Sequence, residues 1–212
     1  MAKGKARKKT TLKDPFKELV SICIGILAGT LIFSHNWTMP SETLIEFQAL
    51  LLPFTLSFFF YYLAQRYMAE RLRCNMSYNL WIPGIVFSLM LMLVGIKLFL
   101  IGGIIISAYK FGRFGMKDRL PSIQEIGFIS VAGPLMNMIV VAIFNVLTYY
   151  IGSNPFFADM IFLNSWMAFF NLIPIKDLDG GKVMFWYPMF WMILMFFAIL
   201  LITPSNMLSF FT

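Results

Sequence analysis

The residues that could do chemistry lie in two short segments of an otherwise apolar chain. The first, residues 132–137, reads Ala-Gly-Pro-Leu-Met-Asn; its small residues permit close helix contact, and Asn137 carries an amide. The second, residues 170–183, places Asp177 and Asp179 beside the helix-breaking Pro174. Ionisable groups at membrane depth are rare and by default mark function. Taken alone, helix packing explains the first segment, and a cytoplasmic turn with solvated carboxylates stays open for the second.

The composition is that of an integral membrane protein. Hydrophobic residues make up 59% of the 212 positions and charged residues only 13%, with a mean hydropathy of +0.78. A soluble domain carries charge on about a quarter of its positions, so this chain could not cover a surface exposed to water. Intrinsic disorder and nucleic-acid binding are excluded on the same ground. Cys23 and Cys74 are the only cysteines and imply no disulfide framework.

Positive charge is concentrated at the N-terminus. Seven of the 17 Lys and Arg residues fall in residues 1–17, directly before the first apolar run. This distribution predicts a basic cytoplasmic tail that contacts anionic lipid headgroups, and no nucleic-acid partner.

The apolar runs predict an all-α polytopic protein with a single transmembrane domain, residues 18–212. The five expected spans are about 19–34, 49–65, 129–150, 156–174 and 183–203. Every basic residue except Lys97 then lies on the cytoplasmic side or at its boundary. The positive-inside rule therefore places the chain in the plasma membrane with its N-terminus in the cytoplasm and its C-terminus outside.

The long apolar stretch 80–108 does not fit a simple span. It ends in another basic loop, at residues 110–119, which a full crossing would place outside. We therefore expect a re-entrant element. Its second half, Leu98–Ser107, is β-branched and contains glycine, which favours a short strand pair.

Five passages together resemble the site-2 protease family of intramembrane zinc metalloproteases, particularly its short archaeal members. They are Phe60–Arg66, at the place of the His-Glu-x-x-His helix; Leu98–Ser107, at the membrane-embedded strands; Glu125–Asn137, at the Gly-Pro motif; Asn171–Gly180, at the Asn-Pro…Asp-Gly motif; and Lys182–Trp191, at the continuation that follows. The matching motif residues are Gly133, Pro134, Asn137, Asn171, Pro174 and Gly180. The resemblance implies a site-2-protease-like bundle.

The resemblance also implies that the zinc centre is missing. The positions of the two zinc-binding histidines correspond to Tyr61 and Gln65, that of the catalytic glutamate to Tyr62, and only the aspartate remains, as Asp179. A catalytic zinc site needs three protein ligands and an open position. The single histidine, His35, is expected on the outer side of the membrane. We therefore predict a pseudoprotease with no catalytic residue, no bound metal and no cofactor.

A lost metal leaves a hole and a carboxylate without its cation. Tyrosine and glutamine are large, neutral hydrogen-bond donors. We therefore expect Tyr61, Tyr62 or Gln65 to fill the former metal position and at least one of them to donate a hydrogen bond to Asp179. Lys176 or Lys182 could pair with that carboxylate instead.

The sixteen methionines raise a second metal hypothesis, because thioethers favour Cu(I). Met189, Met192 and Met195 share a helical face, and Met90 and Met92 lie in the re-entrant stretch. With no histidine nearby, we interpret them as residues that fill gaps in a helix bundle.

A chain that keeps a protease bundle without its reaction centre is expected to act through what it binds. We expect a structural or accessory subunit packed against other integral membrane subunits, and not an enzyme by itself. A regulator or chaperone that holds transmembrane segments of clients is the alternative, and an active intramembrane metalloprotease is the weakest reading.

Overall fold

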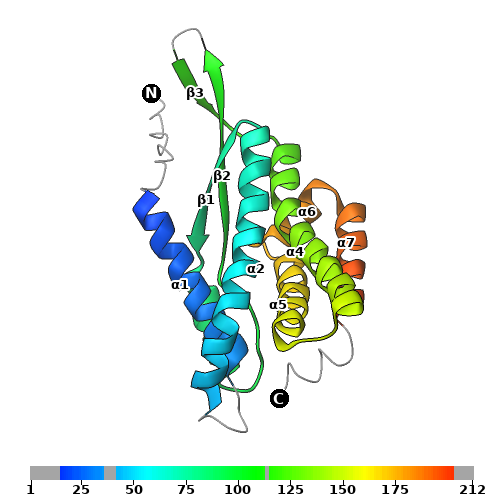
Figure 1. Ribbon diagram of the computed structural model, residues 1–212. Coiled ribbons are helices and arrows are strands. Elements are labelled where there is room, and N and C mark those ends of the chain that lie inside the picture. Colours follow the sequence, from blue (N-terminus) through cyan, green and yellow to red (C-terminus); the bar gives the residue numbers. More distant parts are fainter. Residues whose placement is uncertain (1–14, 36–41, 113–114, 203–212) are drawn as a thin grey trace.

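The computed structural model describes residues 15–35, 42–112 and 115–202 (Figure 1). Most of the predicted basic tail and residues 203–212 lie outside this range. The elements are α1 (Pro15–Ser34), α2 (Thr43–Arg71), β1 (Cys74–Leu80), α3 (Ile82–Met92), β2 (Gly102–Gly112), β3 (Gly115–Arg119), α4 (Ile123–Ile151), α5 (Pro155–Leu172), α6 (Asp179–Trp186) and α7 (Pro188–Leu201). Three of them, α1, α2 and α4, are long and apolar enough to cross a membrane.

The fold is mostly helical, as predicted, but its strands extend beyond the one strand-like element expected: three strands form an antiparallel sheet in the order β1-β2-β3. The strand expected within Leu98–Ser107 begins only at Gly102 and pairs with β1, in register from Leu80↔Gly102 to Cys74↔Ala108. The sequence of β1, Cys-Asn-Met-Ser-Tyr-Asn-Leu, alternates strictly between apolar and polar residues and is buried on one face. That period of two is the signal of a half-buried strand, although no strand was expected at this place.

The basic segment 110–119 is also not a loop. It forms the end of β2 and the whole of β3, paired from Ala108↔Arg119 to Gly112↔Gly115. This hairpin extends beyond the ends of the helices (Figure 1).

The predicted span 183–203 is two helices, α6 and α7, interrupted at Tyr187. Pro188 is the first residue of α7, and Tyr187 has an extended backbone with φ −151° and ψ 94°. Proline disfavours helical geometry in the residue before it, so the break is encoded locally. The prediction counted the apolar residues and passed over this proline.

Local capping fixes the ends of α4 and α5 and leaves only a short connection between them. The side chain of Ser122 accepts from the amide of Glu125, and the Glu125 carboxylate accepts from the Ser122 amide, which starts α4. Gly152, with φ +103°, ends α4. Asn154 then caps α5 through the amide of Phe157, with Pro155 as the first helical residue. The connection of only three residues makes the two helices antiparallel neighbours (Figure 1).

Strand β1 forms one edge of the sheet and is covered by helices. In Figure 1, β1 lies between α1 and α2. The amide of Tyr78 donates to Glu18 Oε1 of α1 at 2.8 Å. Arg66 of α2 donates to the carbonyl of Met76 at 3.4 Å. An edge strand with open backbone groups invites pairing with other chains, and these side chains occupy two of those groups.

The reactivity of the Cys74 thiol tests whether β1 is covered in the folded protein. Its side chain is 1% exposed, and burial raises the pKa of its thiol. A raised pKa means less thiolate at pH 8, so N-ethylmaleimide should label the folded chain about tenfold or more slowly than the unfolded chain. Mass spectrometry of labelled Cys23→Ser protein measures this ratio. Equal rates would show that β1 is open to solvent.

Candidate functional site

The centre of the candidate site is one face of α2. Ser57, Tyr61 and Gln65 are spaced four residues apart, so their side chains lie along one side of the helix. All three are buried, at 0%, 3% and 0% exposure. This polar row inside an apolar helix is the feature that any function of the site must explain.

Asp179 approaches this row from the start of α6. Its side chain lies in the first turn of that helix, where the helix dipole favours negative charge. The connection from α5 turns sharply: Ile173 is extended before Pro174, and the amide of Leu178 donates to the carbonyl of Ile175 at 3.0 Å. Leu178 is 1% exposed and Asp179 also 1%. The aspartate is therefore held inside the protein and does not lie in a solvated turn.

Three side chains converge on the Asp179 carboxylate. The Tyr61 hydroxyl donates to Oδ2, and Gln65 Nε2 donates to the same oxygen at 2.6 Å. The Lys182 ammonium lies 3.4 Å from Oδ1. The predicted hydrogen bond to Asp179 is confirmed for Tyr61 and Gln65, and of the two lysines Lys182 is the one that pairs with the carboxylate.

Lys182 also connects the site to the sheet. Its ammonium donates to the carbonyl of Ile104 in β2 at 3.0 Å. Asp179 and Lys182 are one helical turn apart on α6, so the carboxylate is linked to α2 on one side and to β2 on the other. Sequence reasoning did not foresee the bond to Ile104, because it depends on a strand that crosses near α6.

Tyr62 lies outside this cluster. Its hydroxyl donates to Glu18 Oε1 at 3.0 Å, toward α1 and β1. A residue adjacent to Tyr61 on a helix points about 100° away, which explains the separation. Glu18 was not among the predicted site residues, and nothing in its sequence context singles it out.

The glycine of the Gly-Pro segment explains how α4 reaches the site. A Cβ atom on Gly133 would lie 2.4 Å from Tyr61 Cε2 and 2.8 Å from Gln65 Nε2. Only hydrogen fits there, so α4 packs directly against the two side chains that bind Asp179. Gly180 has the same role on α6, since its Cβ would lie 2.1 Å from the carbonyl oxygen of Leu172.

Replacing Gly133 by alanine should lower the free energy of unfolding by about 1–3 kcal/mol, the usual effect of overpacking. Denaturant titration in mixed micelles, followed by tryptophan fluorescence, measures it. The control is Gly25→Ala, whose added methyl group meets nothing closer than Tyr78 Oη at 3.2 Å. It should change stability by less than about 1 kcal/mol. Equal effects of the two substitutions would contradict the close contact at Gly133.

The other motif residues have different surroundings. Asn137 is fully buried on α4, and neither atom of its amide has a hydrogen-bond partner among the described residues. The close helix contact that this segment permits therefore buries the amide without supplying a hydrogen-bond partner from these residues. Asn171 donates to the carbonyl of Met167 at 2.9 Å within its own helix. Pro174 lies just beyond the end of α5.

A further polar contact continues the row of α2. Asn164 Nδ2 donates to Ser57 Oγ at 2.7 Å and to the carbonyl of Met160, also at 2.7 Å. Ser57 in turn donates to the carbonyl of Pro53 at 2.8 Å. The contact between Asn164 and Ser57 was not predicted. The spacing of four residues between Ser57 and Tyr61 could have placed Ser57 on the same face of α2, but no such pattern indicated Asn164.

The donor set does not fit a catalytic zinc ion. A catalytic zinc site needs three protein ligands, each a histidine nitrogen, a cysteine sulfur or a carboxylate oxygen. Asp179 supplies the only carboxylate of this cluster, and its neighbours are a phenol, an amide and an ammonium. Among the described residues, no three His, Cys, Asp or Glu side chains lie close enough to share a metal ion. His35 follows the last residue of α1, and Cys74 lies in β1.

The chain is similar in sequence to a protein that is named as a metalloprotease. The chain is 28% identical over 186 residues to a protein of Methanocaldococcus jannaschii named "Putative zinc metalloprotease"; the match covers 84% of this chain and 88% of that protein. No family model matches the chain. No solved structure matches it either.

Proposed function

We propose that this chain is a site-2-protease-like membrane protein that has lost zinc catalysis and acts by contact, as a structural or accessory subunit of a larger membrane complex. The observation that carries the proposal is that neighbouring side chains already bind both oxygens of the Asp179 carboxylate. Both Tyr61 and Gln65 donate to one of its oxygens, and Lys182 neutralises the other. The similarity to a protein named as a zinc metalloprotease supports the proposed ancestry, and the phenol, amide and ammonium around Asp179 support the proposed loss of zinc catalysis.

The proposed topology has five crossings, formed by α1, α2, α4, α5 and the pair α6–α7. The antiparallel arrangement of α4 and α5 in Figure 1 supports it, as does the length of α1, α2 and α4. With the N-terminus in the cytoplasm, the β2–β3 hairpin and the C-terminal end of α2 lie on the cytoplasmic side, where their basic residues belong.

The hollows of the surface favour lateral contact over a client held inside. The hollow beside Lys182 and Asp177, near the occupied carboxylate, has a volume of only about 110 Å³. Larger hollows lie outside, between α1 and α2 with about 660 Å³ and along α4, and they are lined almost wholly by apolar side chains. Surfaces of this kind meet lipid or other membrane helices.

Purification of the full-length chain from its native membrane in a mild detergent tests the proposal. Mass spectrometry should find the same partner subunits in fixed stoichiometry, and metal analysis should find well under one zinc per chain. Partners present in small and variable amounts would favour a regulator that holds clients. One zinc per chain that a chelator removes, with peptide cleavage by the isolated chain, would overturn the proposal.

A further inference from the structure

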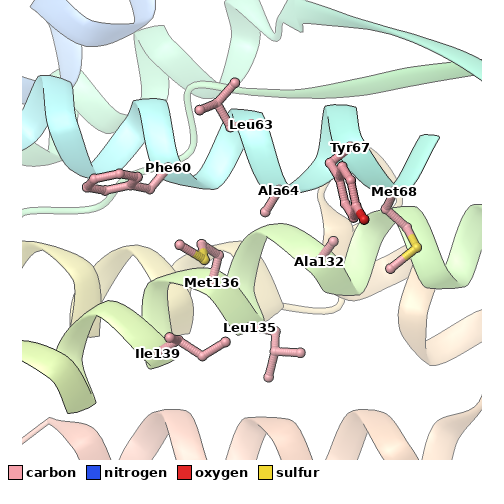
Figure 2. Close-up of a pocket in the computed structure, with 9 residues that line it drawn as sticks. All are labelled: Phe60, Leu63, Ala64, Tyr67, Met68, Ala132, Leu135, Met136 and Ile139. Atoms are coloured by element: carbon pink, nitrogen blue, oxygen red, sulfur yellow. The ribbon is translucent and has the colours of Figure 1, made fainter. Parts of the chain in front are cut away.

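An apolar groove runs along the outer surface between α2 and α4 (Figure 2). Its volume is about 390 Å³, and every residue that lines it is apolar or aromatic: Phe60, Leu63, Ala64, Tyr67, Met68, Ala132, Leu135, Met136 and Ile139. From Phe60 to Tyr67 it follows α2 for about 10 Å. The small side chains of Ala64 and Ala132 leave the space between the two helices.

The groove adjoins a second hollow on the other side of α4. This hollow has a volume of about 470 Å³ and is closed by Phe128, Trp186, Tyr187 and Phe190. Met68, Ala132 and Leu135 line both hollows. An acyl chain can therefore lie along α4 in either hollow, with Leu135 between the two.

A fixed cation lies at the end of the groove that is nearest the C-terminus of α2. Tyr67 lines the groove, and its hydroxyl accepts from Arg71 Nε at 2.9 Å and from Nη2 at 2.6 Å. The guanidinium carbon of Arg71 lies 5.2 Å from the centroid of the Tyr67 ring. Stacking and hydrogen bonding together hold the guanidinium over the groove residue.

The charge of Arg71 is not matched by a carboxylate. Within the described part of the chain, Arg66 pairs with Glu70 at 3.2 Å and Arg119 pairs with Glu125, whereas no such pair includes Arg71. The contacts to Tyr67 use two of its three nitrogens, so N–H groups remain for an acceptor. A guanidinium binds phosphate oxygens particularly well.

We propose that this groove binds an anionic phospholipid, with its phosphate on Arg71 and an acyl chain between α2 and α4. An apolar channel that ends in an unmatched cation is complementary to a hydrocarbon chain that carries an anionic head. A transmembrane helix of a partner would fill the channel without using the charge. Tyrosine and arginine at the end of a span also lie at headgroup depth.

Native mass spectrometry of the delipidated full-length protein tests the site. Dioleoyl phosphatidylglycerol should bind about tenfold more tightly than dioleoyl phosphatidylcholine, because both carry the phosphate but only phosphatidylcholine has a quaternary ammonium that offsets the attraction to Arg71. Arg71→Gln should abolish this preference. The matched control, Arg73→Gln, removes the same charge two residues farther along, outside the groove, and should keep it. Leu135→Trp should weaken binding of both lipids, because its ring fills the groove.

A competition experiment and a cross-linking experiment distinguish a bound phospholipid from other occupants of the groove. Glycerol phosphate, which has no acyl chain, should not compete with the phospholipid. A photoreactive residue at Leu135 should cross-link to lipid in the native membrane. Equal affinity for the two lipids, a preference that survives Arg71→Gln, an equal loss in Arg73→Gln, or cross-linking of Leu135 to a protein would each overturn the assignment.

Discussion

Replacing Asp179 by alanine should lower the free energy of unfolding by about 3–5 kcal/mol, the range found when one partner of a buried pair is removed. The Tyr61 hydroxyl, Gln65 Nε2 and the Lys182 ammonium all converge on this carboxylate. Tyr61 and Gln65 are 3% and 0% exposed, so water cannot replace the lost acceptor without opening the helix contact.

Denaturant titration in mixed micelles measures this change, and two variants sharpen it. Asp177→Ala removes an exposed carboxylate two residues away and should shift stability by less than about 0.5 kcal/mol. Asp179→Asn keeps an oxygen acceptor and should fall between the two. If Asp179→Ala and Asp177→Ala have the same effect, the carboxylate does not hold α2 to α6.

The second large effect is a gain of metal binding. Tyr61→His with Gln65→His should create a zinc site of two imidazoles and the Asp179 carboxylate, with a dissociation constant of about 1 μM or lower, equal to about −8 kcal/mol. Tyr61 and Gln65 already reach the same oxygen of Asp179. Imidazoles at these positions therefore project toward the point where a shared ion would lie.

Metal analysis and isothermal titration in detergent test the gain. The matched control is Phe60→His with Ala64→His, the same spacing one residue earlier on the helix, which lines an apolar groove without a carboxylate and should bind zinc at least tenfold more weakly. Adding Asp179→Asn to the first variant should also reduce the affinity. Equal affinities of the two histidine pairs would contradict the proposed correspondence of Tyr61 and Gln65 to zinc-binding histidines.

Part of the candidate site could be predicted from the sequence. Residues four apart on α2 share a face, and the resemblance to the site-2 protease family implied that this face meets Asp179. Gly133 could be placed near them by the resemblance alone. That its hydrogen atom faces Tyr61 and Gln65 could not, because this depends on the rotation of α4 about its axis.

The sheet was predicted only in part, since a short strand pair was expected within Leu98–Ser107 but β1 and β3 were not. The alternation in residues 74–80 is that of a strand, yet no strand of seven residues was expected there. The contact of Lys182 with Ile104 and that of Glu18 with Tyr78 join elements far apart in the chain. Local patterns contain no information about such pairs.

The broken helix at Tyr187 shows a different limit. Hydropathy counts apolar residues and does not register where a backbone amide is missing. Pro188 was visible in the sequence, and its effect on Tyr187 follows from sterics alone. A rule based on backbone geometry would have divided the last span correctly.

The carboxylate of Glu18 is shared by two elements, since one oxygen accepts both from the amide of Tyr78 and from the hydroxyl of Tyr62. A helix fastened at one point to a strand and to a second helix cannot turn about its axis or slide by itself. α1 is therefore held in phase with α2, and a movement of either helix would have to break these hydrogen bonds or carry the other helix and the edge of the sheet with it.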